Sequence, residues 1–506
     1  MTVSASQNHP LTSELFAAID LGSNSFRLET ARISAGRYRK EFYVKETVRL
    51  GAGLDAGGCL TQEAVARAMD CLEAFALHLK GFDDFRIRAV ATQTLREASN
   101  RDEFLEQAQE VLGVPIEVIS GREEARLIFT GVSHLQSIQE PTLVADIGGR
   151  STELILGQNF QAWEVESFPV GSVSLALSYF PSGVLTRRAF YQAKTAVAAQ
   201  FEEATQAFGS HRWTQVLGTS GTVNAVFHIL QANGFEQDCI DRSGIEWLLA
   251  QCIEAGSSER LNFAGLKDDR RPVLAGGLAV LMGLFDQFDI EELRPAKGSL
   301  RQGVIVELDA RLRDQAEHAF ELRDRTITQL QRRFTVDADQ AMRVRRVCQE
   351  LIFSALGPID AESVREMSWA CDLHEIGSYI SHHDHHRHSA YILSHVEAPG
   401  FSQSQMRRLG RLVLSQRGGL RKIEQDLRNT TFAWMVLCLR LAVIVCHSRR
   451  DLSLSGLRLR RLTVKEAVVT ISDLKSSQHD TLLHLLRDEC EHWVRSGVLR
   501  VVLEVS

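Results

Sequence analysis

Proline is scarce in this sequence, and paired cysteines and an apolar N-terminal stretch are missing. Only nine of its 506 residues are proline, which argues against long disordered linkers. Its nine cysteines form no CxxC pair and have no even spacing, so we expect reduced thiols rather than a disulfide framework, a zinc site or a redox centre. The first ten residues, MTVSASQNHP, have neither a basic start nor an apolar stretch, unlike a secretory signal. These absences predict a cytoplasmic protein.

Long apolar runs are also missing. The longest, Phe432 to Cys446, is interrupted by Arg440 and is shorter than the roughly 20 residues that cross a bilayer. We therefore expect a buried helix there and no integral membrane span. With 44% apolar and 24% charged residues the chain can bury sizeable cores, and its length predicts two to four compact units.

The net charge of −7 hides a strongly basic segment. Residues 401–461 contain thirteen Lys and Arg but only three Asp and Glu. A positive surface there would hold an anionic chain with salt-sensitive affinity, whereas a set of solvated helix faces explains the same charges equally well. The candidate track residues are Arg407, Arg408, Arg411, Arg417 and Arg421.

An internal repeat is the most informative pattern. FAAIDLGSNSFRL (16–28) and LVADIGGRSTELI (143–155) both contain an apolar run, then Asp, an apolar residue, Gly, two variable residues and Ser, followed by a second apolar stretch. Because the pattern occurs twice, it predicts a duplicated domain. The repeated positions are Asp20, Gly22 and Ser25 in the first copy and Asp146, Gly148 and Ser151 in the second.

Each copy is typical of two strands joined by a tight turn. A glycine turn lets backbone N–H groups approach a phosphate closely, but the Asp carboxylate would repel that phosphate unless a divalent cation lay between them. Asp20 and Asp146 therefore predict Mg²⁺ or Mn²⁺, which prefer oxygen ligands and share them with substrate phosphates. One such turn alone is an ordinary hairpin, whereas two copies facing each other predict a phosphate cleft.

Strand and helix signals alternate up to about residue 315, which is typical of an α/β fold. The predicted elements are strands at 86–92 and 116–120 and helices at 61–80 and 101–112. Beyond residue 315 the patterns become long and helical, as in AMRVRRVCQELIFSAL (341–356), and strand patterns return only at 460–471 and 497–505.

VISGREEARLIFTGV (118–132) places two adjacent acids in the first turn of a predicted helix. Glu123 and Glu124 there suit the positive end of the helix dipole, so N-terminal capping explains them without any catalytic role. The surrounding motifs favour a second explanation.

Nine motifs, in order along the chain, carry a resemblance to a known family. They are AAIDLGSNSFRL (17–28), VRLGAGL (48–54), AVATQTLREASN (89–100), VISGREEARLIF (118–129), DIGGRSTEL (146–154), GTSGTVNA (218–225), PVLAGGLAVL (272–281), SLRQGV (299–304) and LHEIG with HHRHSAYIL (373–393). Over nearly its whole length the chain resembles the exopolyphosphatase and guanosine pentaphosphate phosphatase family. The resemblance implies two actin/sugar-kinase-like α/β domains around a phosphate cleft, then a mainly helical HD-like domain and a small C-terminal α+β region. The expected domains are 1–140, 141–314, 315–455 and 456–506.

The resemblance also implies roles for particular residues. Glu124 is implied to be the catalytic base that activates water for in-line attack on the terminal phosphorus. Asp146 is implied to hold Mg²⁺, with Glu153 and Asp20 supporting the ion directly or through water. The implied phosphate-binding residues are Gly22, Asn24, Ser25, Arg96, Gly148, Ser151, Gly221 and Arg270.

Two positions depart from the family pattern. Arg150 stands where DIGG(G/A)ST has a small residue, and its guanidinium would either reach phosphate or crowd the loop. That choice leaves open whether Gly149 touches phosphate closely. Ser172 stands where cysteine is frequent, so thiol chemistry does not transfer.

The stretch DLHEIGSYISHHDHHRHSAYIL (372–393) resembles the helix pair of a metal-dependent HD phosphohydrolase, but its dyad is His374–Glu375 rather than His-Asp. A structural and substrate-guiding role is favoured over a second metal site. Histidines that would add positive charge when protonated are His382, His383, His385, His386 and His388.

We therefore expect a Mg²⁺-dependent exopolyphosphatase that removes terminal phosphate processively from inorganic polyphosphate. The alternatives are a guanosine pentaphosphate 5′-phosphohydrolase that uses the same cleft, an alarmone-binding regulator without turnover, and an ATP-using kinase of the sugar-kinase type, against which the Glu124 motif argues. The resemblance implies a homodimer, and no nucleic-acid partner is expected.

Overall fold

The structure is a computed structural model that describes residues 14–34, 36–316, 322–450, 457–472 and 478–505. It divides into two compact units, Met1–Ala319 and Phe320–Ser506, so the expected change of character near residue 315 lies beside this division. The first ten residues and the expected boundary at 455/456 lie outside the described residues.

The first half of the amino-terminal unit is built on a five-stranded sheet in the order β3-β2-β1-β4-β5. Its strands are β1 (Glu14–Leu21), β2 (Phe26–Ser34), β3 (Arg37–Glu46), β4 (Ile87–Ala91) and β5 (Ile116–Val118), and its helices are α1 (Gln62–His78), α2 (Gln93–Glu97) and α3 (Arg101–Leu112). α1 begins after the Thr61 cap and buries Ala64, Ala68, Leu72 and Phe75, the stripe of an amphipathic helix. The strands and helices predicted in this half are confirmed.

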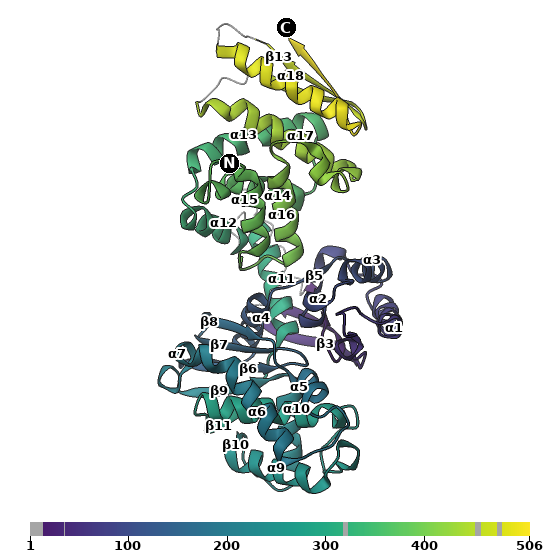
Figure 1. Ribbon diagram of the computed structural model, residues 1–506, viewed down its shortest axis with the longest axis vertical. Helices are drawn as coiled ribbons and strands as arrows, with labels where there is room; N and C mark the ends of the chain where they lie inside the picture. Colours follow the sequence, from purple (N-terminus) through teal and green to yellow (C-terminus); the bar gives the residue numbers. More distant parts are fainter. Residues whose placement is uncertain (1–13, 35, 317–321, 451–456, 473–477, 506) are drawn as a thin grey trace, which may run out of the picture. The chain divides into compact units, whose positions relative to one another are not determined.

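The second half repeats that topology. Its strands are β6 (Thr142–Ile147), β7 (Thr152–Gln158), β8 (Gln161–Phe168), β9 (Gln215–Thr219), β10 (Ile240–Asp241) and β11 (Glu292–Pro295), and its helices are α5 (Ser172–Tyr179), α6 (Arg187–Phe201), α7 (Thr205–Phe208), α8 (Ser220–Ala232), α9 (Arg242–Ala255) and α10 (Leu274–Gln287) (Figure 1). The order β8-β7-β6-β9-β11 corresponds to β3-β2-β1-β4-β5. Two antiparallel pairings are followed by two parallel pairings in each sheet. The predicted duplicated α/β fold is confirmed.

Two helices, α4 (Gly121–Leu135) and α11 (Leu300–Ala316), join the halves. One apolar cluster includes Phe16 of the first sheet, Val144 of the second, and residues of both helices. A Cβ atom on Gly303 of α11 would overlap the carbonyl group of Leu127 in α4, so glycine allows the two helices to touch. This packing fixes the segments that precede and begin both helices, which contribute to the site described below.

The carboxy-terminal unit is mainly helical. Its elements are α12 (Leu322–Arg333), α13 (Ala338–Leu356), α14 (Ala361–Leu373), α15 (His385–His395), α16 (Gln403–Ser415), α17 (Thr430–Val445), β12 (Leu457–Thr463), β13 (Glu466–Ile471), α18 (Gln478–Ser496) and β14 (Arg500–Val505). The last three strands form a sheet in the order β12-β13-β14, with α18 beside it (Figure 1). The predicted helical character and the late return of strands are confirmed.

The apolar run predicted as a buried helix is α17. Within the described residues, Thr430–Ser448 is the one helical stretch with the length and hydropathy to cross a membrane, and 72% of its apolar window is buried inside the protein. Arg440, which interrupts the run, is itself buried and forms a two-nitrogen ion pair with Glu489 of α18. A paired buried arginine suits the core of this unit.

Candidate active site

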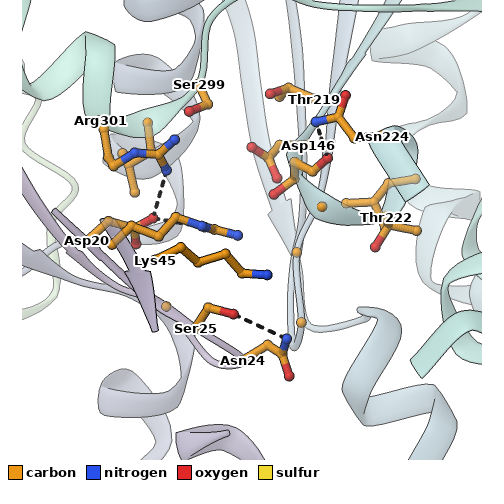
Figure 2. A pocket seen from close by; sticks show the side chains of 18 of the residues that line it. Asp20, Asn24, Ser25, Lys45, Asp146, Thr219, Thr222, Asn224, Ser299 and Arg301 are labelled. Carbon is orange, nitrogen blue, oxygen red and sulfur yellow. Dashed lines mark hydrogen bonds and ion pairs between the residues drawn. The ribbon is translucent and has the colours of Figure 1, made fainter. Parts of the chain in front are cut away.

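A cleft of about 510 Å³ in the amino-terminal unit is lined by both copies of the repeat. Figure 2 shows Asp20 and Lys45 on one side of this cleft and Asp146 and Thr222 on the other. The predicted site residues that line it are Asp20, Gly22, Asn24, Ser25, Glu124, Asp146, Gly148, Ser151, Gly221 and Arg270. Arg96 and Glu153 are not among the lining residues and lie behind residues that are. The sequence therefore predicted most of the wall of one cleft.

The two turns have the same local geometry. A Cβ atom on Gly22 would lie 3.0 Å from the carbonyl oxygen of Ser25, and one on Gly148 would lie 3.0 Å from that of Ser151. Both serines are buried. Each turn is thus closed so tightly that a side chain at its glycine would push against the serine carbonyl, and a glycine turn of this kind lets the backbone approach an anion closely.

The carboxylate of the first turn is already paired with arginines. Asp20, at the end of β1, accepts from Arg27 at 3.1 Å and from Arg301 at 3.4 Å. Arg27 is its cross-strand neighbour in β2, whereas Arg301 comes from the start of α11. Asp20 therefore holds two guanidinium groups beside the cleft, and its predicted support of a metal ion stays a prediction.

The carboxylate of the second turn has acidic neighbours instead. Burial and the nearby carboxylates of Glu124 and Asp20 together raise the pKa of Asp146 to about 7, against a hydrogen bond from Ser220 and the charge of Arg27. Its cross-strand neighbour in β7 is Glu153. Burial, Glu124 and Asp146 hold the pKa of Glu153 well above its usual range, and its carboxylate accepts from the Ser167 hydroxyl at 2.8 Å. This cluster of buried acids is a site where a cation would relieve repulsion.

The two adjacent glutamates of α4 point to different partners. Ser120 caps the helix by accepting from the Glu123 N–H at 3.1 Å, and the Glu123 carboxylate pairs with Arg126. Glu124 instead lines the cleft and accepts from Arg96 at 2.8 Å. Ser120 therefore caps the helix. Glu124, in the first turn of α4, points its carboxylate into the cleft. Burial raises the pKa of Glu124, and the Arg96 charge opposes that shift.

The donor set fits a divalent cation held by few protein ligands. Among the described residues, no group of three or more His, Cys, Asp and Glu is placed to hold a metal ion, so Asp20, Asp146 and Glu153 do not form a three-ligand centre. Mg²⁺ is commonly held by one or two carboxylates together with substrate phosphates and waters. Asp146 lines the cleft and, among the described residues, forms no arginine ion pair like those of Asp20, although the Arg27 charge lowers its pKa, so it suits that arrangement.

Several basic residues of the cleft were not predicted from the sequence. They are Arg27, Lys40, Lys45, Lys267, Lys297 and Arg301. The position of Arg27 inside the first copy of the repeat was a usable signal, because residues directly opposite each other on neighbouring strands face the same side of a sheet. The others come from distant segments: Lys45, for example, reaches Asp269 at 2.6 Å across 224 residues.

Arg270 depends on the glycine of the GTSGT motif. A Cβ atom on Gly221, in the first turn of α8, would collide with the Arg270 guanidinium. Burial and the neighbouring Arg27 lower the pKa of Arg270. The guanidinium groups of Arg27 and Arg270 repel each other, and Arg270 lies against the first turn of α8. Such a group of positive charges beside a helix N-terminus suits the binding of an anion. Ser220, with φ of 78°, was also missed and turns the chain so that its side chain meets Asp146.

The departures from the family pattern are resolved by the structure. Arg150 neither lines the cleft nor crowds the turn: its guanidinium binds Glu97 at 2.6 Å and the Gly51 carbonyl at 3.1 Å, both in the other half. Ser172 lines the cleft at the start of α5 and donates to the Gly148 carbonyl at 3.1 Å. It therefore supports the second turn.

The predicted track in the carboxy-terminal unit is partly neutralised. Arg408 binds Glu366 and Arg411 binds Asp426, each at 2.7 Å, and Arg407 also has an interaction partner. Arg417 and Arg421 are exposed. The solvated-face alternative thus accounts for part of the basic segment.

The histidine-rich stretch carries less charge than predicted. Burial lowers the pKa of His386 to about 4 and lowers that of His385. These two side chains would therefore add positive charge only at a lower pH than an unperturbed histidine. His374 is buried and donates from Nδ1 to the Cys371 carbonyl at 2.7 Å.

Comparison with known proteins gives two family matches. The pattern of the Ppx/GppA phosphatase family matches residues 31–311, and that of Ppx/GppA phosphatase domain III matches residues 322–487. The first range begins within β2, so it leaves out β1 and the first turn but includes the second turn and α4, and the second range includes most of the helical unit.

Solved structures agree with that match. A crystal structure of an exopolyphosphatase-like protein is 26% identical with a TM-score of 0.53, and an exopolyphosphatase from Cytophaga hutchinsonii is 25% identical with a TM-score of 0.53. A Ppx/GppA family member from Aquifex aeolicus is 24% identical with a TM-score of 0.50 and shows the fold. Each comparison covers 59% of this chain and 98% of the other.

Proposed function

Because the chain belongs to the Ppx/GppA phosphatase family, we propose that it is an exopolyphosphatase. It removes the terminal phosphate of inorganic polyphosphate in the presence of Mg²⁺, or Mn²⁺, and releases orthophosphate. Repeated action on one chain, a homodimeric state and the C-terminal basic track are parts of the same proposal.

The charge of the cleft is the observation that carries this proposal. Seven Lys and Arg line it against four Asp and Glu, on a protein whose net charge is −7. Ligand pockets for organic molecules are mostly apolar, but the apolar lining residues here are few: Ile147, Ala225, Ala296 and Leu300. The aromatic ring of Tyr43 is covered by the Arg301 guanidinium at 5.3 Å. Such a surface suits a chain of phosphates better than a nucleobase.

Glu124 is proposed to accept the proton of the attacking water. It lines the cleft at the positive end of α4, where the Arg96 guanidinium fixes its carboxylate. A raised pKa makes the ionised carboxylate a stronger base than an exposed glutamate. No covalent bond between protein and phosphate is needed for this step.

Asp146 is proposed to hold the divalent cation, with Glu153 below it. When bound, the cation polarises the phosphoryl oxygens and neutralises their charge. Arg27, Arg270 and the N–H groups of the first turn and of α8 bind phosphate oxygens and orient the terminal phosphorus toward Glu124. These fixed donors would stabilise the charge that develops on the phosphoryl oxygens in the transition state.

A guanosine pentaphosphate 5′-phosphohydrolase is the second candidate, since it would use the same acids and phosphate-binding turns. Orthophosphate release from long-chain polyphosphate and from guanosine pentaphosphate, each with Mg²⁺ and with EDTA at several salt concentrations, separates the two. We expect a higher kcat/KM for polyphosphate that falls with salt and requires Mg²⁺. A salt-independent preference for the nucleotide would reverse the ranking, and nucleotide binding without phosphate release would identify an alarmone-binding regulator.

A further inference from the structure

Arg150 occupies a junction between the two phosphate-binding turns. Its Nε and Nη2 atoms bind the Glu97 carboxylate at 2.8 and 2.6 Å, and its Nη1 atom donates to the Gly51 carbonyl at 3.1 Å. Arg150 belongs to the second turn, whereas Glu97 and Gly51 belong to the first half of the unit. The Arg150 side chain is 19% exposed and the Glu97 side chain 30% exposed, so their ion pair is partly open to solvent.

The Gly51 contact connects Arg150 to the first turn. The Gly51 N–H donates to the Ser23 carbonyl at 2.7 Å, while its own carbonyl accepts from Arg150. A Cβ atom on Gly51 would lie 2.8 Å from the Cδ atom of Arg150, so glycine makes room for the arginine. The turns also approach directly, since a Cβ atom on Gly149 would lie 3.1 Å from that of Ser23.

The Glu97 contact continues as a chain of hydrogen bonds to Glu124. The Gln93 amide donates to Glu97 at 2.6 Å, and the Gln93 carbonyl accepts from the Nε and Nη2 atoms of Arg96 at 2.9 and 2.7 Å. The remaining nitrogen of Arg96, Nη1, binds Glu124 at 2.8 Å. Gln93, Arg96 and Glu97 all lie on the single short helix α2.

Each link of this chain has a defined direction. A glutamine amide has one accepting and one donating end, and a guanidinium only donates. Because the Glu97 carboxylate accepts from the NH₂ end of the Gln93 amide, the oxygen of that amide faces the Arg96 guanidinium. Arg96 is also held by the Ile119 carbonyl, which accepts from Nη1 at 3.0 Å. Without Glu97, the opposite orientation of the Gln93 amide would set donors against donors and remove the two contacts of Arg96 Nε and Nη2 that help to orient this guanidinium.

We propose that Arg150 is a positioning residue that couples the meeting of the two phosphate-binding turns to the orientation of the Glu124 carboxylate through Glu97, Gln93 and Arg96. Arg150 itself touches no substrate, because it does not line the cleft. The inference rests on the proposed role of Glu124 as the base. It adds that contact between the two halves of the unit controls the orientation of the Glu124 carboxylate.

Steady-state kinetics on long-chain polyphosphate with Arg150→Ala, Glu97→Ala and the double variant test this coupling. We expect each single change to lower kcat about tenfold, a size typical of residues in one hydrogen-bond network, with KM within about twofold of the wild type. The double variant should be no slower than the slower single variant. Arg150→Lys, which keeps a charge for Glu97, should recover most of kcat.

Arg122→Ala is the matched control. Arg122 of α4 and Glu166 of β8 also form an ion pair between the halves, at 2.7 Å, but that pair is not part of the chain to Glu124. The control should retain wild-type kcat, and thermal melting should show that all variants are folded.

Additive losses in the double variant, an unchanged kcat in Arg150→Ala, or an effect on KM alone would overturn the proposal. If the wild type acts on guanosine pentaphosphate but not on polyphosphate, the proposed substrate fails and the same four variants are compared on the nucleotide. If it releases phosphate from neither, Glu124 is no base and the coupling proposal is overturned with it.

Discussion

The hairpin around Asp20 and the hairpin around Asp146 have the same backbone arrangement at their turns. They differ in the charge of the residue that lies opposite the aspartate on the neighbouring strand. In the first, the residue opposite the aspartate is Arg27; in the second it is Glu153. Arg27 and Arg301 neutralise Asp20, whereas burial and neighbouring acids raise the pKa of Asp146. The two copies of the turn therefore differ in the ion that they suit. The first hairpin, here called the anion arm, suits an anion, and the second, the cation arm, suits a cation. A phosphate bridged by a metal ion would need both.

The largest effect should come from a change that leaves both hairpins intact. Glu124→Gln removes the proposed base without altering either turn, so kcat should fall roughly 10²- to 10⁴-fold while polyphosphate affinity stays close to that of the wild type. Orthophosphate release and equilibrium binding measure the two quantities. A parallel loss of affinity would show that Glu124 belongs to the binding surface.

Removing the charge of the second hairpin should be nearly as severe. Asp146→Asn takes away the proposed cation ligand, so kcat should fall on the order of 10²- to 10³-fold and the Mg²⁺ concentration for half-maximal rate should rise. Asp20→Asn is the matched control in the first hairpin. Equal Mg²⁺ responses in the two variants would contradict the division of the hairpins into cation and anion arms.

Removing the arginine of the first hairpin should affect binding. Arg27→Gln deletes a charge-assisted contact to phosphate, so KM for polyphosphate should rise about tenfold to a hundredfold with a smaller change in Mg²⁺ dependence. Gly221→Ala should act in the same direction, because its methyl group displaces the Arg270 guanidinium. A change in Mg²⁺ affinity larger than the change in KM would argue that the arms are not separate.

The acid cluster predicts a pH dependence of stability in EDTA. The folded pKa of Asp146 is about 7 and that of Glu153 is also raised, whereas both groups ionise near pH 4 when unfolded. The folded protein then binds more protons, so its free energy of unfolding should fall as pH rises from about 4 to 7. Glu153→Gln should make this decline shallower in chemical denaturation. Mg²⁺ should stabilise the wild type more at pH 8 than at pH 5.

The smallest effects should come from paired arginines outside both hairpins. Arg408 and Arg411 are half-exposed and already bound to acids, and such surface pairs contribute about 0–1 kcal/mol. Arg408→Ala and Arg411→Ala should therefore change KM for long polyphosphate by less than about twofold. Joint replacement of the exposed Arg417 and Arg421 should have the larger effect, and the reverse order would refute the proposed track.

Much of the fold followed from local patterns. The helix at 62–78, the strand at 87–91 and the buried α17 were predictable because periodicity and capping act over a few residues. The repeat likewise predicted the hairpins and their topological duplication. The burial of His385 and His386 could not be read from a polar sequence, since burial depends on which helices pack over them.

The candidate site was predictable where the family motifs supply its residues and unpredictable where distant segments meet. Glu124, Asp146 and both glycine turns line the cleft as expected. Arg96 is instead bound to Gln93 and Glu124, so its predicted contact with phosphate remains a prediction. The environment of Arg150 had two proposed outcomes, and the structure shows a third.

The sequence by itself determined two tight Asp-x-Gly hairpins, because turn geometry depends on the glycine and on the few residues around it. Only the tertiary structure decided which distant charges each aspartate meets besides its cross-strand neighbour: Arg301 reaches Asp20 from 281 residues away, and Glu124 approaches Asp146 from helix α4. Coulomb interactions depend on distance in space rather than along the chain, so the chemistry of each hairpin is set by packing.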